Sequence, residues 1–270
     1  MGCSESVPMR GEWMHYLVTG GAGFIGSNTV DELVRCGHDV VVVDDLSSGT
    51  AGNLANVRTK IKLIQGTITD LDVVREACRG VDCIIHLAAQ TSVPRSVKDP
   101  IETNLINVNG TLNVLVAARD AKVKRVVFAS SCAVYGKTSV LPIRESATLA
   151  PISPYGLSKQ IGEAYGRVFQ ELYGLEFVSL RYFNVFGPRQ DPGSAYSGVL
   201  SLFNDAVLAG TQPTVYGDGE QSRDFVYVEN VVEAILLAAA AKGAHGLAFN
   251  IGTGDRHTLN QTLALLERIT

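Results

Sequence analysis

A glycine-rich segment between an apolar run and a helix-length segment constrains the fold of this chain more than any other feature. The segment TGGAGFIGS follows Tyr16–Val18 and places Gly20, Gly23 and Gly26 at three-residue intervals. Glycine permits a tight turn and a close approach of backbone to a pyrophosphate, and the free N–H groups of the following helix attract that anion. A glycine triplet alone is weak support, but this strand-loop-helix context is typical of a dinucleotide-binding unit.

An acidic pair stands where such a unit needs one. Asp44 lies at the end of the apolar run Val40–Val43, about 20 residues after the glycines, and Asp45 follows it. A carboxylate there accepts hydrogen bonds from both ribose hydroxyls and repels a 2′-phosphate, and no arginine follows immediately. We therefore expect NAD as the cofactor in preference to NADP. The alternative is that Asp44 and Asp45 form a solvated turn.

Short apolar runs alternate with helix-length segments through the first two thirds of the chain. Several runs are apolar at consecutive positions, as central parallel strands buried on both faces are. Repeated strand-helix-strand units predict an α/β fold with a doubly wound parallel sheet, the Rossmann architecture. The runs lie at residues 16–18, 40–43, 61–64, 83–88, 126–129 and 177–183, and the helix-length segments include 24–36, 101–121 and 154–173.

The sequence changes character after Asn184. Residues 187–198 are rich in glycine, proline and serine, which predicts a long loop. Beyond it we expect helices at 200–208 and 231–241 and short strands at TVYG (214–217), FVYV (225–228) and AFNIG (248–252). We predict a disordered leader over residues 1–13, an NAD-binding Rossmann domain over 14–184 and a smaller α/β substrate domain over 185–270.

The leader has a second interpretation. Its first residues, MGCSES, match a short N-myristoylation pattern, with Cys3 as a second candidate for acylation. The pattern is often met by chance, so we favour an upstream or vector-derived segment. No secretory signal is visible.

Composition excludes several other classes of protein. Hydrophobic residues make up 46% of the chain and charged residues 19%, which is typical of a globular enzyme. The net charge of −4 argues against nucleic-acid or membrane-surface partners, and the longest apolar run, Ala234–Ala241, is too short to span a membrane. Five cysteines without C-x-x-C spacing and five histidines without ligand spacing predict a reduced, cytoplasmic protein with no metal site.

A tyrosine and a lysine stand four residues apart on an expected helix. Tyr155 and Lys159 in YGLSK share one helix face at this spacing. A phenol with a pKa near 10 is a poor base at neutral pH, but a nearby ammonium and a positive nicotinamide lower that pKa. Ser130 and Ser131 end a strand at the edge where ligands bind, so either could hydrogen-bond the same substrate oxygen. The alternative is that both serines satisfy loop backbone.

Together these motifs resemble the extended short-chain dehydrogenase/reductase family, and within it the nucleotide-sugar epimerases of the UDP-glucose 4-epimerase group. The resemblance runs from about Met14 to Arg256. It is highly specific for the family and less specific for the substrate. It rests on TGGAGFIGSN, VVVDDLSSG, HLAAQTSV, NVNGTLNVL, VVFASSCAVYG, YGLSK, LRYFNVFGPRQDP, GDGEQSRDFVYVENVV and NIGTG.

The resemblance implies a set of cofactor-binding residues. Those at the pyrophosphate would be Gly20, Gly23, Phe24, Ile25 and Gly26, and those at the adenine ribose Asp44, Asp45, Leu46, Ser48 and Gly49. Thr67 and Ile68 would lie along the adenine, and Leu87, Ala88 and Ala89 would line the cofactor, with Asn107 behind them. Tyr182 and Phe183 would pack on the nicotinamide side, near Tyr155 and Lys159. Relatives usually carry Asp at position 67, so Thr67 is expected to weaken NAD binding without abolishing it.

The resemblance also implies the catalytic and substrate-binding residues. Ser131, counted back from Val134-Tyr135-Gly136, would be the catalytic serine, Tyr155 the base and Lys159 its tuner. The alternative role of Arg223 is that of a surface charge paired with Asp224. The alternative role of Tyr216 is that of a residue packed in the core. The implied substrate contacts are Ser92, Ser131, Asn184, Val199, Leu200, Tyr216 and Arg223.

The residues after Ser131 favour one reaction of the family. Dehydratases of this scaffold carry a second acid pair before the Val-Tyr-Gly, and decarboxylases a Glu, whereas this chain has Cys132 and Ala133. Oxidation and re-reduction at one carbon need one base only, so we expect C4 epimerisation of a UDP-hexose through a 4-keto sugar, with tightly held NAD. The alternatives are a dehydratase, decarboxylase or reductase of the same family, or a non-catalytic NAD-binding protein.

Two further expectations follow from the resemblance. Relatives continue for several tens of residues beyond NIGTG, so this chain is expected to be short at its C-terminus, as a fragment or as a naturally short member. The helical segments 101–121 and 154–173 carry apolar residues in several directions, and in relatives the corresponding helices pair. We therefore predict a homodimer.

Overall fold

The structure is a computed structural model that describes residues 13–191 and 199–269. The expected leader, apart from Trp13, lies outside the described residues. The same holds for residues 192–198 of the expected long loop.

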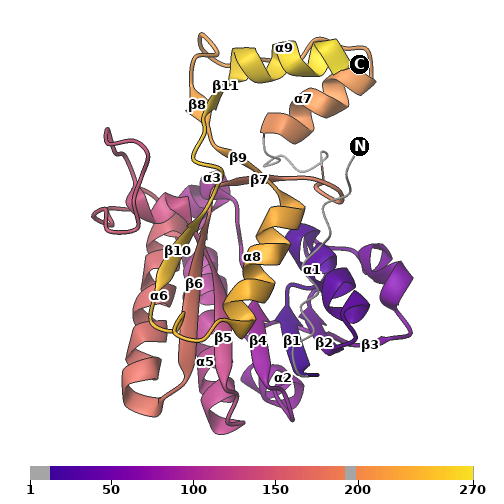
Figure 1. The fold of residues 1–270 in the computed structure, drawn as a ribbon, viewed down its shortest axis with the longest axis vertical. Coiled ribbons are helices and arrows are strands. Elements are labelled where there is room, and N and C mark those ends of the chain that lie inside the picture. The colour runs from indigo at the N-terminus through magenta and orange to yellow at the C-terminus, as the bar shows by residue number, and fades with distance from the viewer. Residues whose placement is uncertain (1–12, 192–198, 270) are drawn as a thin grey trace.

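Seven parallel strands form the central sheet (Figure 1). Their order across the sheet is β10-β6-β5-β4-β1-β2-β3. The chain starts in the middle at β1, moves outward to β3, returns to β4 beside β1 and then moves outward on the other side. This order confirms the predicted doubly wound Rossmann fold. The strands are β1 (His15–Thr19), β2 (Asp39–Asp44), β3 (Ile61–Gln65), β4 (Cys83–His86), β5 (Arg125–Ser131), β6 (Glu176–Tyr182) and β10 (Ala248–Ile251).

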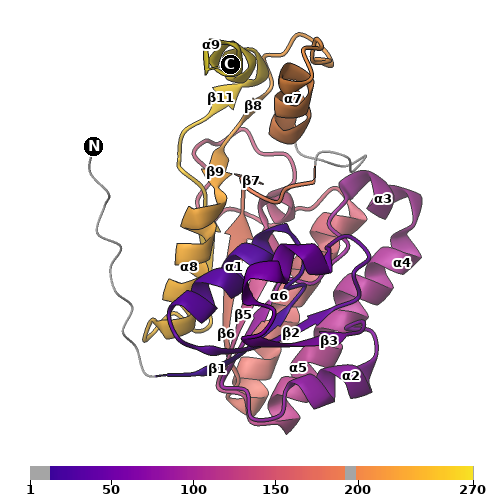
Figure 2. The ribbon, with the colours of Figure 1, turned by 90° about the vertical axis from the view of Figure 1, so that its right-hand side faces the viewer.

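Helices cover both faces of the sheet, which explains the apolar runs. Tyr16 and Val18 of β1 enter the core beneath α1, the 3₁₀ helix η1 and α8, whereas Leu17 enters the core beneath α2, α5 and α6. Figure 2 shows these helices around the sheet. Successive residues of a strand point to opposite faces, so a strand covered on both sides is apolar throughout. The helices are α1 (Phe24–Arg35), η1 (Ala51–Val57), α2 (Leu71–Ala77), α5 (Gly110–Asp120), α6 (Pro154–Tyr173) and α8 (Val228–Ala240).

The local sequence fixes where α6 begins. Ser153 is its N-cap, and the Ser153 side chain accepts a hydrogen bond of 3.0 Å from the N–H of Gly156. Pro154 stands in the first turn, where its missing N–H has no cost. The first turn of α6 therefore lies at the carboxyl ends of the strands, and Tyr155 lies with it.

The segment expected as one helix over 101–121 is built from three pieces. Its first piece is α4 (Pro100–Asn104), followed by a π-helical turn over Leu105–Asn109 and then by α5. A π-turn inserts an extra residue into the helix and often occurs at functional sites. The turn contains Asn107, one of the residues expected near the cofactor.

Two other expectations are corrected by the structure. TVYG (214–217) forms no strand, because Gly217 and Gly219 adopt left-handed φ values of 80° and 75° and turn the chain there. AFNIG was expected in the smaller domain, but β10 pairs with β6 in the large sheet, with Ala248 opposite Ser179. The helix α8 crosses over a face of the sheet and returns the chain to that edge. The domain boundary at residue 185 stays a prediction, although α8 and β10 lie with the larger layers.

The remaining elements lie beyond the carboxyl ends of the strands (Figures 1 and 2). The helix α3 (Val93–Lys98) follows β4, and a 3₁₀ turn, η3 (Cys132–Tyr135), follows β5. Two small sheets pair β7 (Asn184–Phe186) with β9 (Phe225–Tyr227) and β8 (Ser222–Arg223) with β11 (His257–Thr258). The helices α7 (Val199–Leu208) and α9 (Leu259–Ile269) complete this upper region. Within the described residues, no helix is long and apolar enough to cross a membrane.

Candidate active site

The glycine loop joins β1 to α1 in a form that excludes side chains. Gly20 has φ of 71°, and its N–H donates to the carbonyl of Val43 at 2.8 Å. A Cβ at Gly20 would lie 2.7 Å from the backbone nitrogen of Ala88, and one at Gly26 would collide with the carbonyl oxygen of Gly20. Gly23 is the N-cap of α1 and carries no capping side chain. The N–H groups of the first turn are thereby left for an anion, as the motif predicts.

Asp44 connects the glycine loop to the loop after β2. Its two carboxylate oxygens accept hydrogen bonds of 2.8 Å each, one from the N–H of Ala22 and one from the N–H of Leu46. Burial raises the pKa of Asp44, while these two hydrogen bonds lower it. Each oxygen keeps a lone pair for a ribose hydroxyl. Asp45, in contrast, is exposed and, within the described part of the chain, accepts hydrogen bonds from Ser47 alone.

The other residues expected along the adenosine differ in their burial and in the hydrogen bonds that they already make within the protein. The hydroxyl of Thr67 already bonds within its own loop, to the hydroxyl of Thr69 at 3.0 Å and the N–H of Thr69 at 3.2 Å. Ile68 is buried and packs where a side chain on Gly110 would stand. Ser48 is exposed, and Gly49 is buried against the backbone of Ala22.

The segment expected to line the cofactor after β4 is held by a buried histidine. His86 Nδ1 lies 2.7 Å from the hydroxyl of Thr19, which accepts the N–H of Ala88, and His86 Nε2 lies 3.0 Å from the hydroxyl of Thr111. Thr111 donates its proton to the carbonyl of Asn107, so Nε2 of His86 carries the ring proton and Nδ1 accepts. Burial, assisted by the charge of Lys159, lowers the pKa of His86 to about 3. The neutral ring thus ties the cofactor-lining segment to β1 and α5.

Asn107 is buried, and its side chain forms hydrogen bonds with Gln90 and Ser158. Its oxygen accepts the N–H of Gln90 at 2.8 Å. Its amide donates to the carbonyl of Gln90 at 2.9 Å and to the hydroxyl of Ser158 at 3.0 Å. Asn107 therefore joins the loop after β4, which holds Leu87 and Ala89, to α6.

The three expected catalytic residues meet at the end of β5 and the start of α6. The hydroxyl of Ser131 accepts the N–H of Ala133 at 3.1 Å. Burial raises the pKa of Tyr155 to about 12, and a hydrogen bond from Ser131 opposes this shift. Burial lowers the pKa of Lys159 to about 7, and its Nζ lies 5.9 Å from the centre of the Tyr155 ring. Each charged form alone is costly in this site, whereas a phenolate and an ammonium side by side compensate each other.

The two strand-end serines point to opposite faces of β5. Ser130 donates a hydrogen bond of 2.5 Å to the carboxylate of Glu163, whose other oxygen bonds Arg181 at 2.7 Å. Arg181 also donates to the hydroxyl of Tyr135 at 2.8 Å, and Tyr135 donates to Asn250 at 2.6 Å. Ser130 is thus committed to a structural network, which leaves Ser131 as the serine beside Tyr155.

Sequence reasoning missed this network, although two signals for it were present. Arg181 is a lone charge inside the apolar run 177–183, and a charge in a buried strand requires a partner. Glu163 stands four residues after Lys159, so it continues the buried face that carries Tyr155. The network holds β5, β6, β10 and α6 together beneath the catalytic residues.

The strand after α6 brings a second tyrosine to the site. Tyr182 pairs with Ser131 across β5 and β6. It is buried, and its hydroxyl has no hydrogen-bond partner among the described residues. Burial raises the pKa of this phenol, so the group stays protonated and can donate. A buried donor without a partner fits a site completed by a ligand.

The expected substrate residues lie in the upper region and are less enclosed. Asn184 donates to the carbonyl of Asp224 at 3.0 Å, and Val199 and Leu200 lie half-buried at the start of α7. Tyr216 is 83% exposed, so its alternative as core packing is wrong. Ser92 caps α3, because its hydroxyl accepts the N–H of Arg95 at 3.1 Å.

Arg223 is exposed and does not pair with its neighbour Asp224. Asp224 instead accepts hydrogen bonds from Thr253 and from the N–H of Gly254 at 2.9 Å. Burial raises the pKa of the Cys132 thiol, and the charge of Arg223 opposes this shift. Arg223 therefore acts on the turn that follows the catalytic strand, although it belongs to β8.

Three features of the chain fit an NAD molecule along this edge. The first turn of α1 has no capping side chain, and a Cβ at Gly23 would meet only the oxygen of Gly20, at 3.3 Å. Asp44 keeps free lone pairs beside the loop, and the buried hydroxyl of Tyr182 lacks a partner. These groups would be suited to hold the pyrophosphate, the ribose and the nicotinamide of NAD respectively.

Comparisons with known proteins agree with this geometry. A protein named putative UDP-glucose 4-epimerase from Methanocaldococcus jannaschii is 43% identical over 253 residues, which cover 93% of this chain and 81% of that protein. The structure of the UDP-glucose 4-epimerase of Thermotoga maritima with UDP-glucose matches with a TM-score of 0.91 and 41% identity, over 95% of this chain and 82% of that one. A UDP-N-acetyl-alpha-D-glucosaminuronate decarboxylase from Bacillus cytotoxicus is 36% identical over 94% of this chain and 79% of that protein.

The assignment of this chain to a family rests on a match over most of its sequence. Residues 16–252 match the model of the NAD dependent epimerase/dehydratase family. This match confirms NAD as the expected cofactor. It also agrees with the resemblance to the extended short-chain dehydrogenase/reductases and their nucleotide-sugar epimerases. The chain therefore belongs to the NAD dependent epimerase/dehydratase family.

Proposed function

We propose that this chain interconverts UDP-hexoses by inverting carbon 4 through a 4-keto sugar. The observation that carries the proposal is a single acid–base group, Tyr155, one helical turn from the buried ammonium of Lys159. Cys132 and Ala133 follow Ser131, and burial raises the pKa of the Cys132 thiol. Neither residue supplies a second acid near neutral pH. One base suffices for a reaction that removes and restores hydrogen at one carbon.

In the first half of this reaction Tyr155 removes the proton of the C4 hydroxyl. NAD, which the glycine loop and Asp44 would hold, would supply the hydride acceptor for this half and the hydride donor for the second half. Ser131, beside Tyr155 at the end of β5, hydrogen-bonds the same substrate oxygen. Since burial holds the pKa of Tyr155 at about 12, the Lys159 ammonium and the positive nicotinamide must lower it before proton transfer near neutral pH.

The second half requires the keto sugar to present its other face. The diphosphate therefore has to stay anchored while the sugar turns. Arg223 is the residue that we assign to this anchor, because its exposed guanidinium offers a fork that matches phosphate oxygens. Tyr155 then returns its proton to the oxygen at carbon 4, which completes the epimerisation.

The decarboxylase among the relatives defines the second candidate reaction. Decarboxylation shares the first oxidation step, so Tyr155 and Lys159 do not distinguish the two reactions. The residue at position 133 favours epimerisation, because Ala133 has no acid–base group. A non-catalytic NAD-binding role is disfavoured by the intact set of Ser131, Tyr155 and Lys159.

Proton NMR tests the reaction directly. The purified protein is incubated separately with UDP-glucose, UDP-N-acetylglucosamine and UDP-glucuronate. We expect a galacto-configured product from at least one of them. A 4-keto-6-deoxy product would identify a dehydratase and UDP-xylose from the glucuronate a decarboxylase. Absence of any product, with NAD bound, would refute the proposed activity.

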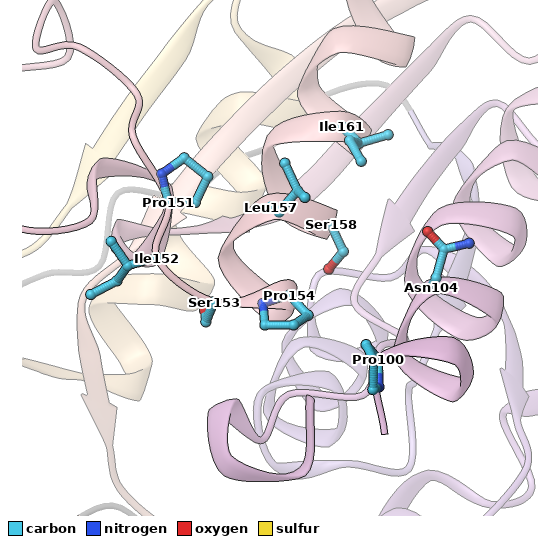
Figure 3. Close-up of a pocket in the computed structure, with 9 residues that line it drawn as sticks. All are labelled: Pro100, Asn104, Pro151, Ile152, Ser153, Pro154, Leu157, Ser158 and Ile161. Atoms are coloured by element: carbon cyan, nitrogen blue, oxygen red, sulfur yellow. The ribbon is translucent and has the colours of Figure 1, made fainter. Parts of the chain in front are cut away.

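We further propose that two copies pair through the face formed by α4 and α6. Figure 3 shows Pro100 and Asn104 of α4 facing Leu157 and Ile161 of α6. These residues and Ile152 line a mostly apolar cavity of about 400 Å³. Ile101 and Leu105 beside this cavity are also exposed, as is Leu172 near the other end of α6. An apolar face of this kind is suited to a twofold helical interface.

Light scattering at micromolar concentration tests this pairing. Leu157→Asp should yield a monomer, because it places a charge in the centre of the face. The matched control is Leu208→Asp on α7, which is also exposed but lies in the upper region. A monomeric unmodified protein, or loss of pairing in the control alone, would contradict the proposal.

A further inference from the structure

The ammonium of Lys159 has an unusual environment for a buried charge. The side chain is 4% exposed, and no carboxylate among residues 13–191 and 199–269 forms an ion pair with it. It lies over the ring of Phe128, whose centre is 5.0 Å from Nζ. A cation within about 6 Å of a ring face is attracted by the negative face of the ring. Phe128 therefore occupies the place where a buried ammonium requires a partner.

Phe128 is fixed in that place by its neighbours. The side chain is 1% exposed in the middle of β5, with the ring of His86 at 5.7 Å on one side and that of Phe177 at 5.6 Å on the other. A Cβ at Gly162 would lie 2.5 Å from Cζ of Phe128, so α6 approaches the ring as closely as a glycine allows. The ring thus has no room to move away from Lys159.

The other titratable groups around Lys159 do not supply a negative charge. His86 on β4 is neutral, since burial lowers its pKa to about 3. Glu163 on α6 is paired at 2.7 Å with Arg181 of β6. Tyr155 on α6 and Cys132 in η3 are both protonated near neutral pH, because burial raises their pKa values.

We propose that Phe128 is a positioning residue of the reaction, whose ring face holds the Lys159 ammonium beside Tyr155 and favours its charged form. This inference rests on the proposed role of Lys159 in tuning Tyr155. It assigns to a residue in the middle of an apolar strand a function that packing alone does not require. Gly162 belongs to the same device, because it allows α6 to place Lys159 over the ring.

The test compares two buried phenylalanines beneath the same helix. Phe128→Leu removes the ring under Lys159, and Phe177→Leu removes a ring that is 2% exposed and packs one turn further along, beneath Gly166. A less stable ammonium loses its proton at lower pH. The apparent pKa of the high-pH side of the kcat profile should therefore decrease by about 0.5–1 pH unit in Phe128→Leu, and should stay unchanged in Phe177→Leu. A third variant, 3,5-difluorophenylalanine at position 128, keeps the shape of the ring and weakens its negative face. It should shift the limb in the same direction by a smaller amount.

A spectroscopic readout keeps this test independent of the proposed reaction. The tyrosinate absorbance of Tyr155 is obtained by subtracting the titration of the matching Tyr155→Phe protein. With a weaker ammonium nearby, Tyr155 should ionise at higher pH in Phe128→Leu than in the unmodified protein. Equal shifts in Phe128→Leu and Phe177→Leu, or an unchanged titration in the difluoro variant, would overturn the inference. If the unmodified protein converts no sugar, the proposed function fails, while this titration still decides the role of Phe128.

Discussion

The cofactor side and the substrate side of this molecule are built in different ways. On the cofactor side Asp44, His86 and Asn107 are buried, and each forms hydrogen bonds within the protein. On the substrate side Tyr216 is 83% exposed and Arg223 is exposed in a two-residue strand. The cofactor side is thus formed by the fold itself. The substrate side consists of side chains on small elements, so changes there should affect binding more than stability.

The difference also has an energetic side. On the cofactor side the buried hydroxyl of Tyr182 has no hydrogen-bond partner among the described residues, and burial disfavours the charged form of Lys159. Such groups reduce stability in return for function. Exposed groups such as Arg223 are hydrated and have no comparable cost. Variants on the two sides should therefore differ in stability as well as in activity.

The largest effect is expected from Tyr155→Phe. The ring remains while the proton acceptor is lost, so turnover should fall by about 10²–10⁴-fold. Binding of NAD should persist, because the glycine loop and Asp44 are unchanged. Turnover is measured by proton NMR, and bound NAD is assayed after denaturation of the purified protein. Retained turnover would remove Tyr155 from the mechanism, and bound NADP would contradict the cofactor.

The next largest effect concerns the cost of the buried lysine. Burial lowers the pKa of Lys159 from 10.5 to about 7. Between these two values the unfolded chain holds a proton that the folded chain lacks, so the contribution of Lys159 to stability rises with pH. Below pH 7 both states are protonated, and the buried ammonium destabilises the folded state fully. Lys159→Met should therefore stabilise the cofactor-free protein by about 2–4 kcal/mol at pH 6, and by less at pH 9.

Urea unfolding at the two pH values measures this difference. The control is Lys62→Met, which changes an exposed lysine paired with Glu76 at 3.2 Å and should show a small effect at both values. The same Lys159→Met protein should lose turnover. A variant less stable than the unmodified protein at pH 6 would show that the ammonium is better solvated than its burial indicates.

A third prediction tests the backbone of the cofactor side. Gly26→Ala places a Cβ against the carbonyl oxygen of Gly20. Because the backbone cannot easily shift to relieve this clash, we expect the free energy of unfolding to decrease by about 1–3 kcal/mol and NAD to bind more weakly. The matched control is Gly23→Ala, whose Cβ would lie 3.3 Å from that oxygen. It should preserve the thermal midpoint and act only on NAD binding. Equal thermal midpoints for both variants would contradict the steric argument.

The Rossmann fold and NAD as its cofactor could be predicted from the sequence, because their signals are local. The glycines, Asp44 and the buried strands each report their environment through composition and spacing. The position of β10 could not be predicted in this way, since nothing in AFNIG specifies that its partner is β6. The turn at Gly217 and Gly219 was missed because TVYG has the composition of a strand, while the glycines that bend it lie at and just beyond its end.

The choice between the two serines shows a similar limit. Their position at the end of β5 left both open, and only the resemblance, by the count from Val134-Tyr135-Gly136, favoured Ser131. Glu163 and Arg181 lie far apart in sequence, so their pairing with Ser130 depends on how α6 packs on β5 and β6. Such long-range pairs follow from the fold and are not visible in local patterns.

The smallest effect is expected on the substrate side, from Arg223→Ala. The charge of Arg223 opposes the raised pKa of Cys132, which follows the catalytic strand, and we propose that the same charge anchors the diphosphate. Loss of a charge-assisted hydrogen bond should raise KM for the sugar nucleotide by about tenfold. Since the side chain is exposed, the thermal midpoint and NAD content should stay unchanged. Arg268→Ala on α9 removes the same charge from another exposed site and serves as the control. Equal KM values for both variants would show that net charge, and not an anchor at position 223, attracts the substrate.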